Sequence, residues 1–311
     1  MRVSELIGKL NEKGAGKVAL QFPEGLKRKA AGVAAALKQN GFFVIISGNP
    51  CYGACDLALE TLEYCDVLVH FGHTPVDHHT DIIYEPFLVD IDLSVMGCAF
   101  PLLREKKIGL VTTAQHIHLI NEMVDHLQNN GFKPIVCHGG DRAPNMGQVL
   151  GCSYEAARRT GAEEILYVGT GVFHPLGVAM ATGARVVALD PCTQTAQEID
   201  ASRMQRRRFM LIERAREAKT IGIIVSSKSG QNRIEVAEYL SSLHEGAAII
   251  LMNEVVPDQL LNLGFDAYVN TACPRLSYDD QERFPAPVLT PVEFEIMCGV
   301  RTWDDFTVDE L

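Results

Sequence analysis

The feature that most constrains the fold is a unit of strand, helix and strand that occurs three times in the chain. The copies begin at Lys17, Lys107 and Thr220. In each copy a short apolar run leads into apolar residues at helical spacing, and these end near a glycine before a second apolar run. Such a repeat predicts three similar domains rather than one large core.

Each copy continues with a third apolar run and a short fourth run. The third runs are 66–70, 164–168 and 266–270, and the fourth runs are 87–89, 186–189 and 287–289. β-Rich runs that alternate with helices are typical of parallel strands with helices on both faces of the sheet. We therefore predict an α/β fold of three domains with four-stranded parallel sheets, spanning residues 1–103, 104–215 and 216–311. Packed as a pseudo-threefold triangle, they bring three sheet edges to one centre.

Composition and charge limit the cellular locations and the kinds of partner that we expect. Hydrophobic residues make up 47% of the chain and its apolar runs are strand-sized, so we expect buried cores and no membrane span. The segment 1–14 has the pattern of an amphipathic helix rather than of a signal peptide, so we expect a cytoplasmic location. A net charge of −11 disfavours binding to nucleic acids or anionic membranes and favours a protein or small-molecule partner.

The chain has nine cysteines, an odd number that disfavours a disulfide framework in a reducing compartment. Ligands of open parallel sheets lie beyond the carboxyl ends of the strands. Each copy has one cysteine in a loop with Gly or Pro at that edge, namely Cys55, Cys152 and Cys273. Soft thiolates favour iron–sulfur clusters, Zn²⁺ or Cu⁺, and a structural zinc site normally takes four protein ligands. Three thiolates on a cubane would leave one iron open to a substrate.

The other cysteines are predicted to be structural. Cys51 and Cys55 form a CxxxC pair, but Ala58 occupies the position where the CxxxCxxC loop of ordinary radical S-adenosylmethionine enzymes has its third cysteine. We assign Cys51 to a structural role. Apolar surroundings or a compact segment assign the remaining cysteines to packing: Cys65, Cys98, Cys137, Cys192 and Cys298.

The segments around the three loop cysteines resemble a known family. Tyr52–Asp56, Leu150–Ser153 and Ala272–Ser277 are similar to the three signature segments of 2-(3-amino-3-carboxypropyl)histidine synthase, which performs the first step of diphthamide biosynthesis. The resemblance covers nearly the whole chain. It implies a [4Fe-4S] cluster on Cys55, Cys152 and Cys273 and an archaeal-type homodimer.

The resemblance also implies the reaction. A 3-amino-3-carboxypropyl group passes from S-adenosylmethionine to C2 of a histidine in translation elongation factor 2. Cleavage of the Cγ–S bond releases 5′-methylthioadenosine, and an electron donor that the sequence does not identify reduces the cluster. No residue stands out as a catalytic acid or base, and we predict none.

S-Adenosylmethionine needs donors and acceptors near the cluster. Arg275 can pair with its carboxylate, or else form an ion pair with a neighbouring side chain. His73 and His174 occupy matching loops, where they either contact substrate or stabilise the loop. Further candidates at the same edge are Gln21, Gln115, Ser226 and Gln231. The segment 227–230 is not a P-loop, because the preceding glycine frame is missing.

Two alternatives and one further prediction remain. Quinolinate synthase also has three α/β domains with one cluster cysteine each, so a quinolinate-synthase-like Lewis-acid enzyme is an alternative. A non-enzymatic scaffold with Zn²⁺ on the cysteines is another. The segment 195–219 is predicted to be one long connecting helix. Its run Arg206–Arg208 predicts a solvated face, or contact with an acidic patch on the protein substrate.

Overall fold

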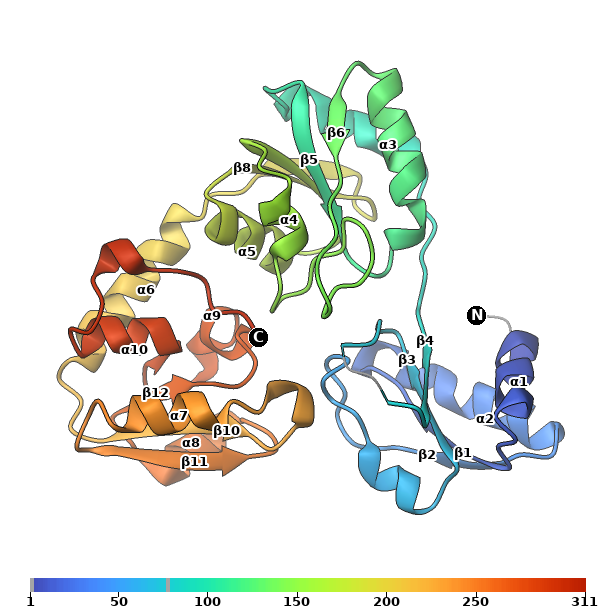
Figure 1. The fold of residues 1–311 in the computed structure, drawn as a ribbon, viewed down its shortest axis with the longest axis horizontal. Helices are drawn as coiled ribbons and strands as arrows, with labels where there is room; N and C mark the ends of the chain where they lie inside the picture. Colours follow the sequence, from blue (N-terminus) through green and yellow to red (C-terminus); the bar gives the residue numbers. More distant parts are fainter. Residues whose placement is uncertain (1–2, 77–78) are drawn as a thin grey trace.

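The computed structural model describes residues 3–76 and 79–311, which form three α/β domains at the corners of a triangle (Figure 1). The sheets of the domains have the strand orders β2-β1-β3-β4, β6-β5-β7-β8-β9 and β11-β10-β12-β13. In each sheet the first strand of the repeat lies between the second and the third strands. The predicted α/β class and the threefold repeat are therefore confirmed.

The first domain holds α1 (Val3–Glu12), β1 (Lys17–Gln21), α2 (Ala30–Gln39), β2 (Phe43–Ile46), β3 (Val67–Phe71) and β4 (Ile82–Glu85). Its four strands are parallel. The fourth strand is at 82–85 and not at 87–89 as predicted, because Ile82 and Ile83 are the buried residues that pair with β3. Val89 instead donates its N–H to the carbonyl of Gln115, on the way to the second domain.

The second domain holds β5 (Lys107–Thr112), α3 (Ile120–Asn129), β6 (Lys133–Ile135), α4 (Glu155–Arg159), β7 (Glu164–Val168), α5 (Phe173–Thr182), β8 (Arg185–Asp190) and β9 (Thr195–Glu198). Strand β9 is antiparallel to β8 and gives this sheet a fifth strand that we did not predict. The Asp190 carboxylate accepts the N–H groups of Cys192 and Thr193, and Gln194 adopts a φ of 55°. This turn sends the chain back along β8, so the predicted helix over 195–219 is wrong at its start.

The third domain holds α6 (Ser202–Ala215), β10 (Ile221–Ser226), α7 (Ile234–Ser241), β11 (Ala247–Met252), α8 (Pro257–Leu263), β12 (Ala267–Asn270), α9 (Arg275–Tyr278), β13 (Val288–Leu289) and α10 (Pro291–Met297). Its four strands are parallel. Within the described residues, every helix is too short or too polar to cross a bilayer.

The repeat extends to single hydrogen bonds. An acidic residue just before or at the start of the third strand accepts two backbone N–H groups that lead into the first strand. Asp66 accepts from Gly16 and Lys17, and Asp266 accepts from Lys219 and Thr220. Glu164 does the same in the second domain, with Arg104 and Glu105 as donors. The three domains therefore share a local device that fixes the register of their central strands.

The cores place the domain boundaries earlier than predicted. Val95, Met96 and Ala99 pack with Ile108 and Leu110, so the segment 93–102 belongs to the second core. Figure 1 shows the chain crossing to the second domain directly after β4. The later turns of α6 bury Ile212 and Ala215 in the third core. The crossings thus lie near residue 90 and, within α6, between Met204 and Leu211, rather than at 103 and 215.

The arginine run of α6 does not form a solvated face as a whole. Arg206 is exposed and Arg207 pairs with the exposed Glu282 at 2.9 Å. Arg208 is fully buried, and its guanidinium donates to the Glu293 carboxylate and to the carbonyls of Ser277 and Val288. The prediction is wrong for Arg208, because the helix turns this side chain into the third domain.

Candidate metal centre

The loops that carry the three predicted cysteines meet at the centre of the triangle (Figure 1). Cys55 follows β2, Cys152 follows β6 and precedes α4, and Cys273 follows β12 and precedes α9. Burial raises the pKa of the Cys273 thiol to about 12, with added contributions from the negative charges of Cys55 and Cys152. Burial also raises the pKa of Cys152, again with a contribution from Cys55. The structure therefore brings one thiol from each domain within electrostatic range of the other two.

Polar N–H donors face two of these sulfurs. Gln231 Nε2 donates to Cys55 Sγ at 2.8 Å, which links the third domain to the first. Arg142 Nη2 lies 3.8 Å from Cys152 Sγ and donates to the Gly230 carbonyl at 3.1 Å. The Arg142 charge lowers the pKa of both Cys55 and Cys152, although burial raises both by more. N–H donors to sulfur are typical of thiolates that bind a metal cluster.

The donor set fits a multi-iron cluster better than a single ion. Three buried thiolates that repel one another need compensating cations, and soft sulfur ligands suit iron–sulfur clusters. Among the described residues, the three cysteine sulfurs do not all lie within 4.8 Å of one another. One ion with three thiolates requires closer spacing, whereas a cubane holds each thiolate on a separate iron. Arg142 Nε is also buried without a hydrogen-bond partner in the described chain, which fits a donor that faces a bound cluster.

Glycines allow the loops to approach. A Cβ on Gly230 would lie 2.8 Å from the Cys55 Cβ, so the segment 227–230 can press against the Cys55 loop only with glycine at this position. A Cβ on Gly151 would lie 2.3 Å from the Phe173 ring. These close approaches explain two glycines in the loops without a phosphate-binding role.

The last four residues of the sequence lie against the centre and form what we call the C-terminal latch (308–311). The Leu311 N–H donates to the Cys152 carbonyl at 3.0 Å, and the Glu310 carboxylate accepts the Tyr154 N–H at 2.5 Å. Asp309 binds the Arg233 guanidinium through both oxygens. Arg233 in turn donates to the carbonyls of Thr271 and Ala272, next to Cys273. The latch therefore holds the loops of two cysteines.

Two predicted substrate contacts lie together where the second and third domains meet. Arg275 is exposed, pairs with Asp279 at 2.8 Å and lies 5.3 Å from the centre of the Phe173 ring. His174 follows Phe173 in α5. Burial, with a smaller contribution from the Arg275 charge, lowers the pKa of His174 to about 4. Arg275 thus has the local ion pair that we gave as its alternative role, and it still faces the second domain.

The other predicted contacts are bound within their own domains or lie apart. Gln21 uses both ends of its amide, which donates to the Asp56 carbonyl and accepts the Ala58 N–H. His73 Nδ1 lies 2.9 Å from His70 Nε2. Ser226 is buried, and its hydroxyl accepts the Lys228 N–H at 3.1 Å. Gln115 is exposed on the crossing between domains, and Gln231 contacts Cys55 as described above.

The sequence did not indicate Arg142 as a residue of the centre, nor the residue with which Lys228 pairs. Arg142 lies in an irregular stretch between β6 and α4 that has no periodicity, and its position in a Gly-rich loop was the one available signal. Lys228 pairs with Asp56 at 2.8 Å across the first and third domains. Asp56 and Lys228 line a cleft of about 790 Å³ between these domains. This volume falls in the range of small-molecule sites. Asp56 adjoins Cys55, so the cleft opens beside the candidate centre.

A family model for diphthamide synthesis proteins matches residues 22–308. The chain belongs to this family. The 2-(3-amino-3-carboxypropyl)histidine synthase of Pyrococcus horikoshii is 39% identical, over 99% of this chain and 92% of the relative. The synthase of Methanocaldococcus jannaschii is 28% identical over 95% and 88%, and synthase subunit 1 of Schizosaccharomyces pombe is 30% identical over 94% and 72%.

The solved structures agree with this family membership. The crystal structure of Dph2 from Pyrococcus horikoshii with a 4Fe-4S cluster matches with a TM-score of 0.94 and 38% identity, over 100% of this chain and 93% of that one. The family resemblance inferred from the three signature segments is therefore confirmed. The named relatives are transferases of diphthamide biosynthesis, and the matched Dph2 carries the cluster type that the resemblance implied.

Proposed function

We propose that this enzyme transfers the 3-amino-3-carboxypropyl group of S-adenosylmethionine to C2 of a histidine in translation elongation factor 2. The observation that carries the proposal is the convergence of Cys55, Cys152 and Cys273, one from each domain, in a chain whose relatives bear the synthase name. An archaeal-type homodimer in the cytoplasm, with a separate electron donor, completes the proposal.

In this reaction different residues would hold the cluster, donate hydrogen bonds to its sulfur ligands and bind the co-substrate. Cys55, Cys152 and Cys273 hold a [4Fe-4S] cluster, with Gln231 and Arg142 as N–H donors to two of the sulfurs. When bound and reduced, the cluster supplies the electron for cleavage of the Cγ–S bond of S-adenosylmethionine, which releases 5′-methylthioadenosine. Arg275 is suited to bind the carboxylate of the co-substrate, because its guanidinium is exposed and its ion pair with Asp279 can exchange.

The other predicted contacts to S-adenosylmethionine are supported by the structure to different degrees. His174 adjoins Phe173, and Arg275 lies 5.3 Å from the centre of the Phe173 ring, so both residues are candidates for one ligand. His73, Gln21 and Ser226 are better placed to shape the loops, because each already has an internal hydrogen bond. Gln115 has the weakest support, because it is exposed at the domain crossing.

The two alternatives lose support for different reasons. The family match includes the three signature segments of the diphthamide enzyme, which disfavours a quinolinate-synthase-like reaction. The three sulfurs, which lie in the described part of the chain, are not all within 4.8 Å of one another, and this disfavours a single zinc ion on these cysteines.

An anaerobic reaction with S-adenosylmethionine, dithionite and elongation factor 2 tests the proposal. We expect 5′-methylthioadenosine as the main nucleoside product by chromatography, and one aminocarboxypropyl group on one histidine by mass spectrometry. Omission of dithionite is the control and should give neither product. The main product 5′-deoxyadenosine would refute the proposed bond cleavage, and quinolinate formation would refute the assigned family reaction.

Arg142→Gln should make the cluster harder to reduce. Reduction adds a negative charge beside the Arg142 guanidinium, which lies 3.8 Å from Cys152 Sγ and stabilises that charge. We expect the midpoint potential to fall by on the order of 60 mV, equal to about 1.4 kcal/mol for one electron. Redox titration followed by electron paramagnetic resonance measures the shift. Arg283→Gln, which removes an exposed guanidinium paired with Asp280, should leave the potential unchanged.

A further inference from the structure

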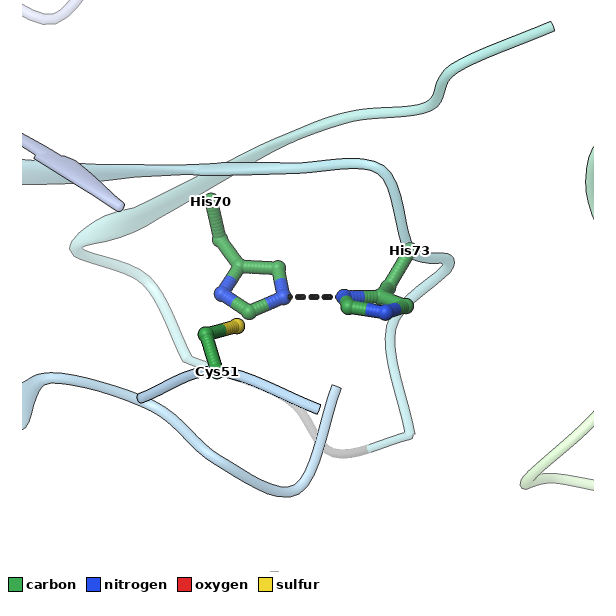
Figure 2. Close-up of side chains that lie close together, drawn as sticks. All are labelled: Cys51, His70 and His73. Carbon is green, nitrogen blue, oxygen red and sulfur yellow. Dashed lines mark hydrogen bonds between the residues drawn. The ribbon is translucent and has the colours of Figure 1, made fainter. Parts of the chain in front are cut away.

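We propose that Cys51, His70 and His73 form a second metal site, which binds one Zn²⁺ or a similar divalent transition metal. Figure 2 shows the three side chains turned toward one another. One ligand atom from each lies within 4.8 Å of the other two, and no other such group of three occurs among residues 3–76 and 79–311. The site shares no residue with the candidate cluster ligands.

The orientation of His70 is the strongest argument for the site. The Gln21 amide oxygen accepts the Ala58 N–H, so it is an acceptor for the His70 ring as well. His70 Nδ1, at 2.8 Å from this oxygen, must therefore carry the proton. The lone pair of Nε2 then points toward His73 and Cys51. A metal-binding histidine typically has this second hydrogen bond, which fixes its tautomer and its ring orientation.

The side chains of Cys51, His70 and His73 need to move only slightly to bind a tetrahedral ion. With Zn–N near 2.05 Å and Zn–S near 2.3 Å, two nitrogens stand about 3.3 Å apart and a nitrogen and a sulfur about 3.6 Å apart. The His70 and His73 nitrogens are 2.9 Å apart in the structure and would separate slightly. His70 lies on β3, whereas Cys51 and His73 lie on loops that can adjust. His73 Nδ1 becomes a ligand when its proton moves to Nε2.

The surroundings suit a cation. Cys51 and His70 are buried, and His73 is half-buried. The groups that act electrostatically on the thiol are the carboxylates of Asp56 and Glu24, the Cys55 thiol and the ammonium group of Lys27. Asp56 also favours positive charge at His73. Binding replaces the Cys51 proton by the metal, so one proton leaves to solvent and the thiolate neutralises one charge of the ion.

The site would act as a brace for the Cys55 loop. Three protein ligands leave the fourth position of the ion for water. The metal would tie the loop 49–51 to the loop after β3, four residues before Cys55. We therefore infer that an occupied site stabilises the first of the three cluster loops.

Metal analysis of the cluster-loaded protein tests the site. Anaerobic protein equilibrated with Zn²⁺ and desalted should contain one zinc per chain in addition to its iron. With Co²⁺ the protein should show a thiolate-to-cobalt charge-transfer band in the near ultraviolet. Cys51→Ser should lose this band and His73→Ala should lose the stoichiometric zinc, while both keep their iron. Cys65→Ser, at another buried thiol, is the matched control and should keep zinc, band and iron.

Two further variants separate this site from the cluster. A Cys55→Ala, Cys152→Ala, Cys273→Ala triple variant should still bind one zinc, so the result does not depend on the proposed function. Gln21→Met, which leaves His70 Nδ1 without its acceptor, should weaken zinc binding roughly 10- to 100-fold. Zinc uptake that is absent in the wild type, or unchanged in both Cys51→Ser and His73→Ala, would overturn the proposal.

Discussion

Cys152→Ala is expected to yield protein with little or no iron–sulfur cluster and with 5′-methylthioadenosine formation at least ~100-fold below that of the wild type. Loss of an outer-shell partner already costs roughly 10- to 100-fold in metal affinity or activity, and a direct ligand contributes more. The same result is expected for Cys55→Ala and Cys273→Ala, because two thiolates hold a cubane poorly. Iron content, absorption near 400 nm and product formation under anaerobic conditions measure the effect.

Cysteines outside the centre provide the controls. Cys65 is buried in a small core cluster of the first domain, and Cys298 packs at the edge of the third core. Cys65→Ala and Cys298→Ala should retain iron. Cys51→Ala should also retain the cluster iron, although it should lose the second metal proposed above. A Cys51→Ala variant without a cluster, together with a Cys152→Ala variant that keeps it, would refute the arrangement of one ligand per domain.

Arg208→Met is expected to lower the free energy of unfolding by about 3–5 kcal/mol. The Arg208 and Glu293 side chains are both fully buried, so removal of the guanidinium leaves a carboxylate without its counter-charge. The carbonyls of Ser277 and Val288 lose donors at the same time. Urea unfolding followed by circular dichroism measures the change.

The neighbouring arginine is a matched control for this effect. Arg207 pairs with Glu282, which is 79% exposed, and exposed ion pairs contribute about 0–1 kcal/mol. Arg207→Met should therefore change the free energy of unfolding by less than about 1 kcal/mol. Equal losses for the two variants would show that the buried pair contributes no more than the exposed one. The double variant Arg208→Met, Glu293→Met should be more stable than Arg208→Met, because it no longer leaves the Glu293 carboxylate buried without its counter-charge.

The sequence predicts the central strands well, because burial on both faces makes them continuous apolar runs. Strand β10 is an example, since all of Ile221–Ser226 is buried. Strand β9 escaped prediction for the opposite reason. Thr195–Glu198 is polar and mostly exposed, and the turn before it depends on Gln194 in a left-handed conformation that usually requires glycine or asparagine. The buried Arg208 escaped for a similar reason, because helical spacing alone does not tell which face of α6 meets the third domain.

Some residues of the candidate centre could likewise be predicted from the sequence, and others could not. The three cysteines could be located because strand ends in parallel sheets predict where ligands gather. Gln231 could be placed at the same edge for the same reason, whereas Arg142 could not. The partners that Arg142, Lys228 and Gln231 contact in other domains leave no local pattern in the sequence. His70 was read as part of an apolar strand. Its bonds to Gln21 and His73 show that a strand interior can carry a polar side chain toward the loops at the sheet edge.

The C-terminal latch has a consequence for the order of events during synthesis. Tyr154 and Glu310 are 156 residues apart, and at about 5–20 residues per second the ribosome needs about 8 to 30 s to cover that distance. Throughout this interval the Cys152 loop has been synthesised, but the Glu310 carboxylate and the Leu311 N–H that bind it have not. Cys273 is also synthesised shortly before the latch. An iron–sulfur donor that acted on the growing chain would meet unrestrained thiols, so insertion is expected to follow emergence of the latch from the ribosome.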